Sequence, residues 1–379
     1  MTDVVIAGYV RSPFHPAHRG ALAKVRPDDL AANTIKGLIE RTGVKAEDIE
    51  DIVMGCAFPE GEQGFNVARI VALLADLPQS IGGITMNRFC GSSMSAVHYA
   101  AGQIAIGAGE VFIAAGVESM SRVPMGGYNP LPNPELAKRS AAYVGMGETA
   151  ENLAKKYEIS RGTQEEFAVD SQRKAGEAMQ KGNFKDEIVP VTLPDGTVVD
   201  TDGTPRPDTT TEALAGLKLA FDENGSVTAG TASPLTDGAS ALLVCSADYA
   251  AKNGLTVLAK IKSIAISGCA PEIMGIGPVE ASKKALERAG LTIDDIDVIE
   301  LNEAFGSQAL ACIGDLGIDQ SRVNLDGGAI AVGHPLGATG ARIVGKTASL
   351  LKREGKKYGL ATQCIGGGQG IATILEAAE

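Results

Sequence analysis

Two stretches far apart in the chain share one pattern of apolar and polar positions. Residues 38–54 read LIERTGVKAEDIEDIVM, and residues 285–301 read ALERAGLTIDDIDVIEL. In both stretches, apolar residues at helical spacing lead to a glycine, then to an acidic turn and a short apolar run. This order predicts an amphipathic helix that ends at Gly43 or Gly290, followed by a buried strand. The chain therefore contains an internal repeat.

The repeat extends beyond these stretches in both directions. An apolar strand precedes each copy, and another strand, a glycine-rich turn, a helix and two more strands follow it. We therefore expect an α/β protein of two similar β-α-β-α-β-β halves, each a mixed sheet flanked by helices. The outer strands predicted for the two halves are Asp3–Gly8, Val111–Gly116 and Ala239–Ser246, and Leu258–Gly268, Gly359–Cys364 and Gly370–Leu375.

The repeat is interrupted between Ser119 and about Thr236. Pro and Gly are dense at 124–134 and 194–207, and two helical stretches lie between these segments. The interruption is either a structural elaboration or a lid over a substrate tunnel, and its length favours the lid. The expected domains are residues 1–118 with about 237–257 as the first half, 119–236 as an inserted loop domain, and 258–379 as the second half.

Composition narrows the class of protein. The net charge of −12 and the pI near 5.0 argue against a nucleic-acid partner. No apolar run is long enough for a transmembrane segment, and the chain enters an apolar strand too early for a targeting peptide. The six cysteines have neither disulfide-motif nor metal-site spacing, which favours free thiols in a reducing compartment such as the cytoplasm.

Cys90 is the first candidate for chemistry. It lies within Asn87–Met94, at the predicted start of a helix. The positive end of a helix dipole lowers a thiol pKa, so we expect a thiolate near neutral pH. The alternative is a buried apolar cysteine, an interpretation that suits Cys245 and Cys312 well.

His334 and Cys364 are the second and third candidates. His334 lies in the glycine-rich segment 327–340, which suits a loop against a ligand, where an imidazole takes a thiol proton or donates to an oxyanion. Cys364 ends a strand before Gly366-Gly367-Gly368, whose backbone N–H groups can face an oxyanion. Asn302 follows a strand at the sheet edge where ligands bind in α/β proteins, and it could orient a water or a carbonyl. The adjacent Glu303 could instead be a helix-start acid without a catalytic role.

Five motifs together resemble the thiolase family of acetyl-CoA acyltransferases, in order and spacing over the whole chain. The resemblance implies a thiolase-like fold with an α/β/α/β/α layering and a homodimer or homotetramer. The motifs are Asn87–Met94, Glu118–Ser121, Asn302–Phe305, Gly327–Gly340 and Cys364–Gly370.

The resemblance also implies roles for single residues. Cys90 matches the acylated nucleophile, His334 its base, and Cys364 the second acid and base. Asn302 matches the residue that holds a water in one oxyanion hole, and the N–H groups of Cys90 and Gly366 match the second hole.

Residues that contact the substrate follow from the same resemblance. Ser233 matches a serine near the CoA pantetheine, and Lys218 stands where the family more often has Arg. Met146 and Phe305 are further candidates for contact with acyl-CoA. Biosynthetic members carry His-Met-Gly where this chain has Gly145-Met146-Gly147, which puts a strict short-chain specificity in doubt.

The expected activity is thiolytic cleavage of 3-ketoacyl-CoA in fatty-acid β-oxidation, with CoA as a substrate and no metal or prosthetic group. The alternatives are a biosynthetic acetoacetyl-CoA thiolase and an inactive acyl-CoA-binding subunit. A ketoacyl carrier-protein synthase is disfavoured because it uses two histidines where this chain has His334 and Cys364. A hydratase/dehydrogenase subunit is a further partner that the sequence leaves open.

Overall fold

The sequence repeat corresponds to two halves of one mixed sheet. The structure, a computed structural model, describes residues 2–378. The strands of the first half are β1 (Val4–Arg11), β2 (His15–Pro16), β3 (Asp51–Gly55), β4 (Gly82–Met86), β5 (Val111–Ser119) and β8 (Thr236–Ser246). Those of the second half are β9 (Ala259–Gly268), β10 (Val298–Leu301), β11 (Tyr358–Ile365) and β12 (Gln369–Ala377).

The two halves join edge to edge. Their strands follow the order β4-β3-β5-β8-β1 and then β9-β12-β11-β10, with β2 beside β8. The junction is short, because β1 pairs with β9 only at Val5 with Lys260 and at Ile6 with Ala259. A single offset of 247 residues relates the halves, since Asp51 pairs with Phe112 as Val298 pairs with Gly359.

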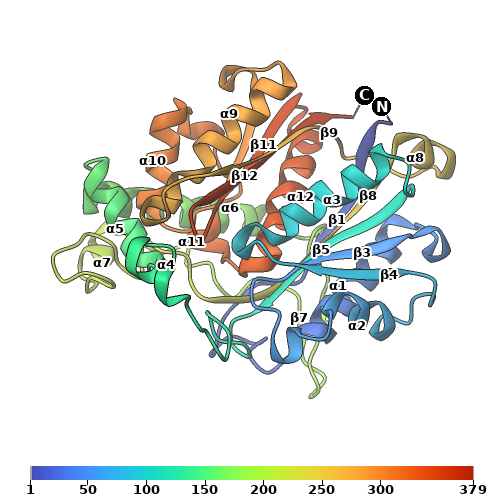
Figure 1. Cartoon of the computed structure of the whole chain (residues 1–379), viewed down its shortest axis with the longest axis horizontal. Helices are drawn as coiled ribbons and strands as arrows, with labels where there is room; N and C mark the ends of the chain where they lie inside the picture. The colour runs from blue at the N-terminus through green and yellow to red at the C-terminus, as the bar shows by residue number, and fades with distance from the viewer. Residues whose placement is uncertain (1, 379) are drawn as a thin grey trace.

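Helices complete the predicted layering, as Figure 1 shows. The helices α3 and α12 lie in the middle and share one apolar core with the inner faces of both half-sheets. Separate cores hold α1 and α2 on one outer face, and α9 and α10 on the other. The bounds are α1 (Pro27–Thr42), α2 (Val67–Leu74), α3 (Ser92–Ala105), α8 (Ala247–Asn253), α9 (Gly277–Ala289), α10 (Gly306–Leu316), α11 (Ala329–Val332) and α12 (Leu336–Glu354).

The repeated helices end as predicted. Gly43 closes α1 at φ 68° and Gly290 closes α9 at φ 67°, a left-handed conformation that glycine adopts without steric cost. The contact between the middle helices also depends on glycine. A side chain at Gly340 of α12 would collide with the Met94 backbone of α3, so the two helices approach closely.

The halves differ from the predicted order in two respects. Each holds a further helix, α2 or α10, and the strand expected after each copy forms only in the first half, as β4. In the second half its place is a single bridge between Ile299 and Val323. Asn324 and Gly327 then take positive φ angles of 49° and 84°, which turn the chain out of the sheet.

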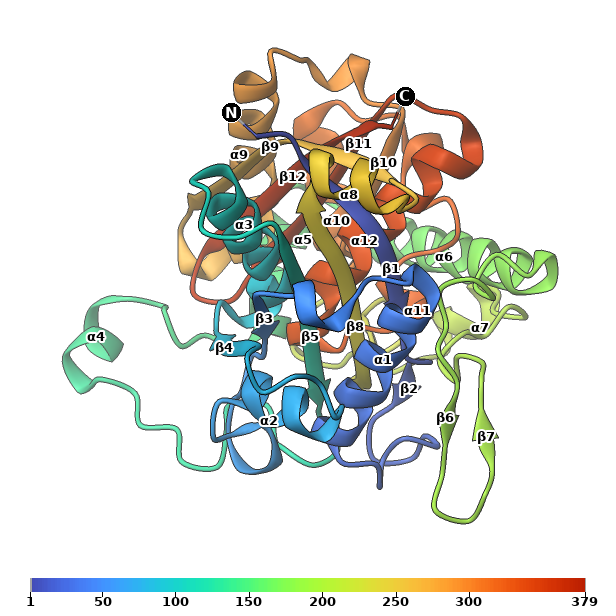
Figure 2. The same cartoon turned by 90° about the vertical axis from the view of Figure 1, so that its right-hand side faces the viewer.

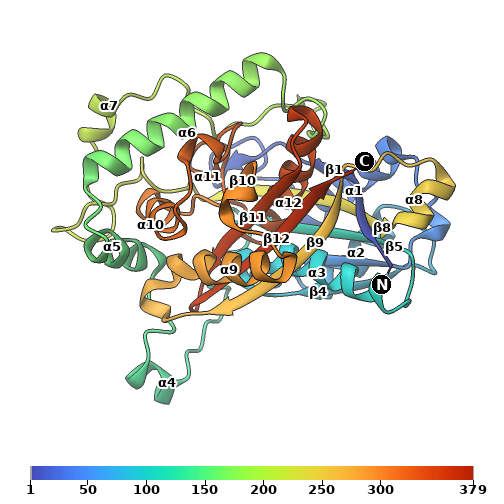
Figure 3. The same cartoon turned by 90° about the horizontal axis from the view of Figure 1, so that it is seen from above.

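The segment between β5 and β8 holds α4 (Pro134–Arg139), α5 (Met146–Lys156), α6 (Arg161–Lys181), α7 (Thr211–Ala215) and the small hairpin of β6 (Val191–Thr192) and β7 (Val198–Val199). In Figures 2 and 3, α4 projects away from the body, while α6 lies along the outside of the second half. The division into domains at residues 118, 236 and 257 stays a prediction.

Candidate active site

Cys90 lies in the turn that enters α3, and the backbone before it is strained. Phe89 has φ 44°, a conformation that is costly for a residue with a side chain. The Phe89 N–H donates to Asn87 Oδ1 at 2.8 Å, and the Ser92 hydroxyl donates to the Phe89 carbonyl at 2.6 Å. These bonds hold the strained turn and fix the direction of the Cys90 side chain.

Apolar side chains surround the Cys90 thiol, which is only 9% exposed and packs against Ala57, Met120 and Leu336. Burial raises its pKa to about 12, although its own backbone N–H and that of Gly366 act in the opposite direction. The expected thiolate near neutral pH is therefore wrong for the free protein, because desolvation outweighs the helix end. Cys90 needs a base to become a nucleophile.

His334 precedes α12 and is held on two sides. Its Nδ1 lies 2.6 Å from Thr339 Oγ1, and its Nε2 lies 3.4 Å from Asn302 Nδ2. Burial, with a smaller effect of the Arg342 cation, lowers the pKa of His334 to about 3. The imidazole is therefore neutral at physiological pH. The Asn302 amide nitrogen can only donate, so Nε2 is the unprotonated nitrogen of the neutral ring and its lone pair faces the Asn302 N–H.

Cys364 and Asn302 complete the inner part of the site. Both are fully buried, and Cys364 packs among apolar side chains that include Ala150, Met274 and Phe305. Burial and then the charge of Cys90 raise the pKa of the Cys364 thiol well above its usual range. The strand that carries Cys364 adjoins the Cys90 turn, because the preceding residue, Gln363, is hydrogen-bonded to the Cys90 carbonyl. Among the hydrogen bonds of the described chain, none uses Asn302 Oδ1, which leaves a buried acceptor in the site.

Hydrogen bonds tie the Cys90 turn to the second half. The Gln363 side chain donates to the Cys90 carbonyl, and Arg88 Nη1 donates to Gln369 Oε1 at 3.2 Å. Gln363 and Gln369 flank the Gly366–Gly368 turn, and a side chain at Gly91, next to Cys90, would collide with Ile365. The structure therefore brings Cys90, Cys364 and Gly366 together at the seam between the halves.

Comparisons with known proteins agree with this geometry. The family model "Thiolase, N-terminal domain" matches residues 4–248, and "Thiolase, C-terminal domain" matches residues 255–377. The chain belongs to the thiolase family, and it is an acyltransferase enzyme of that family.

Relatives of known name cover the whole thiolase chain. A 3-ketoacyl-CoA thiolase of Bacillus subtilis is 45% identical over 390 residues, and one of Vibrio vulnificus is 50% identical over 386. Each alignment covers 99% of this chain and 100% of the relative. The solved human mitochondrial 3-ketoacyl-CoA thiolase, in complex with CoA, superposes with a TM-score of 0.92 at 36% identity, over 100% of this chain and 98% of that one.

Two buried acids of this thiolase hold the site loops, and neither received a catalytic role from the sequence. Glu118, at the end of β5, accepts the N–H groups of Ala57 and Gly337 at 2.8 and 2.9 Å. Glu303 accepts the Ile330 N–H at 3.1 Å and the Ser171 hydroxyl at 2.7 Å. Burial raises the pKa of both carboxyls. Glu118 thereby connects the two halves, and Glu303 holds the segment that leads to His334.

Other supporting residues were missed by the sequence reasoning. Thr339 orients His334 and Gln363 holds Cys90, but neither lies in a spacing that marks it out. Glu118 had a usable signal, because it is a lone acid at the end of an apolar strand. Such an acid is costly to bury unless it accepts hydrogen bonds.

The predicted substrate contacts divide into two groups. Phe305 belongs to the apolar cluster around Cys364, and Met146, at the start of α5, packs against it. Ser233 is bound to the Ala304 carbonyl through its N–H and hydroxyl, at 3.0 and 3.1 Å, and thus lies beside that cluster. Lys218 is exposed on the loop after α7.

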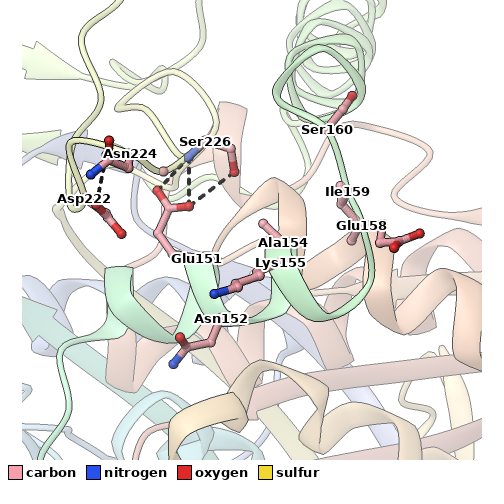
Figure 4. Close-up of a pocket in the computed structure, with 11 residues that line it drawn as sticks. Glu151, Asn152, Ala154, Lys155, Glu158, Ile159, Ser160, Asp222, Asn224 and Ser226 are labelled. Carbon is pink, nitrogen blue, oxygen red and sulfur yellow. Dashed lines mark hydrogen bonds between the residues drawn. The ribbon is translucent and has the colours of Figure 1, made fainter.

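A polar pocket of about 580 Å³ lies outside this cluster, between α5 and the loop of residues 222–226, as Figure 4 shows. None of the predicted site residues lines it. Its Glu151 carboxylate accepts the N–H groups of Ser226 and Val227, so it serves to hold the loop.

Within residues 2–378, no group of three or more His, Cys, Asp or Glu side chains is arranged to hold a metal ion. In the same part of the chain, no helix combines the length and apolar character needed to cross a bilayer.

Proposed function

We propose that this thiolase cleaves 3-ketoacyl-CoA with CoA, giving acetyl-CoA and an acyl-CoA shortened by two carbons, through an acyl-Cys90 intermediate. One observation carries the proposal: two buried thiols, Cys90 and Cys364, lie on segments that meet at the seam between the halves, because Gln363 donates to the Cys90 carbonyl. The segment after His334 reaches the same seam at Leu336, which packs with Cys90. A hydrolase needs only one such thiol. The full-length relatives named 3-ketoacyl-CoA thiolase support the substrate class.

The first half of the reaction forms the acyl-enzyme. His334 takes the Cys90 proton, and the thiolate attacks the 3-keto carbon of the substrate. The N–H groups of Cys90 and Gly366 stabilise the resulting oxyanion. When the bond between C2 and C3 breaks, the electron pair passes to the acetyl-CoA enolate. A water held by Asn302, together with His334, faces the enolate oxygen, Cys364 donates a proton to the enolate carbon, and acetyl-CoA leaves.

The second half releases the product. The Cys364 thiolate takes the proton of an incoming CoA thiol, whose sulfur attacks acyl-Cys90. The acyl–sulfur bond to Cys90 breaks as the new thioester forms, and the Cys90 sulfur recovers the proton held by His334. The apolar surroundings of Cys364 suit an acyl chain and the pantetheine arm, with Met146, Phe305 and Ser233 beside them and Lys218 nearer the solvent for a phosphate.

A chain-length series tests the substrate. Thiolysis rates with free CoA should be higher on C8–C16 3-ketoacyl-CoA than on acetoacetyl-CoA. A strict preference for acetoacetyl-CoA would instead identify the biosynthetic alternative. Alkylation with stoichiometric iodoacetamide tests the inactive alternative: acyl-transfer competence requires Cys90 to react faster than Cys245, and equal rates would contradict it.

We further propose a homo-oligomer located in the cytoplasm of a bacterium. The strand β4 lies at the edge of the sheet, and the neighbouring Asn66 side chain donates to its Gly83 carbonyl. Phe65, which precedes Asn66 and is 93% exposed, offers an apolar contact for a second copy. Light scattering should give a mass of at least two chains, and Phe65→Asp should lower it. Association with a hydratase/dehydrogenase subunit stays a prediction that co-purification would test.

A further inference from the structure

A buried ion pair lies between the elements that carry Asn302 and His334. Glu300 is in β10, two residues before Asn302, and Arg342 is in α12, eight residues after His334. Arg342 Nη1 donates to Glu300 Oε2 at 3.2 Å, and the two side chains are 2% and 0% exposed. In the described chain, this is the one side-chain hydrogen bond between β10 and α12.

The internal repeat provides a comparison for this pair. At the offset of 247 residues, Glu300 corresponds to Val53 of β3, and Arg342 corresponds to Ser95 of α3. Val53 is fully buried in the same middle core. The fold therefore accepts an apolar residue at this strand position, and the charges occur only in the half that supplies His334 and Asn302.

Stability does not account for the charges. A buried ion pair offsets its desolvation cost only when its remaining polar atoms are also hydrogen-bonded, and apolar replacements are often as stable. Here Glu300 Oε1 and the Nε and Nη2 of Arg342 have no hydrogen-bond partner within the described chain. Burial raises the pKa of Glu300 to about 7, although Arg342 lowers it.

We propose that Glu300 and Arg342 are a positioning pair for His334: they fix β10 to α12, which keeps Asn302 and His334 within hydrogen-bond distance. Two observations connect Arg342 with His334. Thr339, which bonds the imidazole, is in the first turn of the same helix, and Arg342 is the charged group that acts on His334.

Other charged and titratable groups face the pair from the elements packed around it. Their charges shift the pKa of Glu300 or of the nearby Tyr9 phenol. Together they form a network of ion pairs that continues to the end of α12. Its members are Tyr9 and Arg11 of β1, Lys346 of α12, Glu187 and Asp326.

This inference rests on the proposed function, so its experiment has one readout that depends on thiolysis and one that does not. The test variant is Glu300→Val/Arg342→Met, which copies the apolar strand position of the first half and leaves no unpaired charge. The matched control is Arg353→Met, which removes the ion pair with Asp326 at the far end of the same helix.

The kinetic readout separates positioning from binding. In the double variant, kcat for thiolysis should fall roughly 10- to 100-fold, because a misplaced catalytic group costs that order of rate. KM should change by less than about twofold, since the pair does not contact substrate. The control should keep kcat within about twofold. An unchanged kcat in a folded double variant would overturn the proposal.

The spectroscopic readout is the titration of His334, followed by NMR of protein labelled with ¹⁵N-histidine and assigned with His334→Asn. In the wild type, His334 should not titrate between pH 5 and 8. Removal of the cation favours the imidazolium, so the double variant should titrate at a higher pH than the wild type, and Arg342→Lys should restore the original behaviour. A purely structural pair would leave this titration unmoved. A wild type without thiolysis would defeat the proposed function, but the titration would still test the pair.

Discussion

The two middle helices occupy equivalent places in the repeat but serve the site in different ways. In the turn before α3, hydrogen bonds hold the strained backbone next to Cys90, and the Cys90 side chain lies in apolar surroundings. The turn before α12 holds His334 by Thr339, and α12 carries the buried charges of Arg342 and Lys346. The halves share a framework, but the turns before their middle helices are held by different contacts.

The same contrast appears at the loops after β3 and β10. The loop after β3 is held by a residue of another strand, because Glu118 of β5 accepts the N–H groups of Ala57 and Phe58. The second loop places Asn302 directly beside His334. The two copies thus share a strand geometry and differ in the contacts of the loops that follow.

The largest loss of thiolysis should follow a substitution in the first half, at Cys90. Cys90→Ala removes the acyl acceptor, so thiolysis should fall by at least about 10⁴-fold, as expected when a covalent nucleophile is lost. Steady-state rates and mass spectrometry of the acylated chain measure the loss. Cys245→Ala, in the core of β8, is the control and should keep both activity and acylation. Retained thiolysis in Cys90→Ala would mean that the nucleophile lies elsewhere.

A change in the second half should slow one partial reaction much more than the other. Cys364→Ala removes the proton donor to the enolate, so cleavage of the C2–C3 bond should slow by about 10²- to 10⁴-fold. Acylation of Cys90 by a simple acyl-CoA breaks no carbon–carbon bond, and its rate should change far less. Rapid-quench assays of both steps make the comparison. Equal losses in both would assign Cys364 to acyl transfer itself.

A charge placed in the equivalent position of the first half should destabilise the fold. Val53→Glu buries a carboxylate without an arginine opposite, and the free energy of unfolding should fall by about 3–5 kcal/mol. Urea unfolding measures this change. Val53→Ile is the control with an apolar side chain of similar shape and should change it by less than about 1.5 kcal/mol. A tolerated Val53→Glu would remove the asymmetry between the halves.

The smallest effect concerns the pH dependence of Cys90. Its raised pKa of about 12 means that the thiolate fraction of the free enzyme grows about tenfold for each pH unit well below that value. Alkylation of Cys90 by iodoacetamide should therefore accelerate from pH 6 to 9 without a plateau. A plateau near pH 7 would instead restore the helix-dipole expectation.

Much of the fold could be predicted because its signals are local. Helix periodicity with a terminal glycine marked α1 and α9, and apolar runs marked β1, β5, β8, β9, β11 and β12. The missing strand after β10 could not be predicted, because positive φ at Asn324 and Gly327 redirects that segment. The helix α2 lies in a short apolar stretch whose pattern is ambiguous between helix and strand.

The site was predictable only where residue type and motif coincide. Cys90, His334, Cys364 and Asn302 stood out by chemistry and by resemblance to the family. Their support did not. Gln363 and Arg342 act through contacts between segments distant in sequence, and Thr339 bonds His334 only because the chain turns into α12 between them. The pKa of Cys90 is raised and not lowered as predicted, because burial depends on the packing of the whole molecule.

The sequence by itself determined the repeated α/β framework, the family and the reactive side chains, because periodicity, turn residues and motifs can each be recognised within a short stretch of the chain. Only the tertiary structure decided that the Cys90 turn meets the strand of Cys364, that His334 is neutral, and that Glu300 pairs with Arg342. Desolvation and ion pairing depend on which atoms surround a group in the folded chain, and the closing of the two halves over α3 and α12 supplies those atoms.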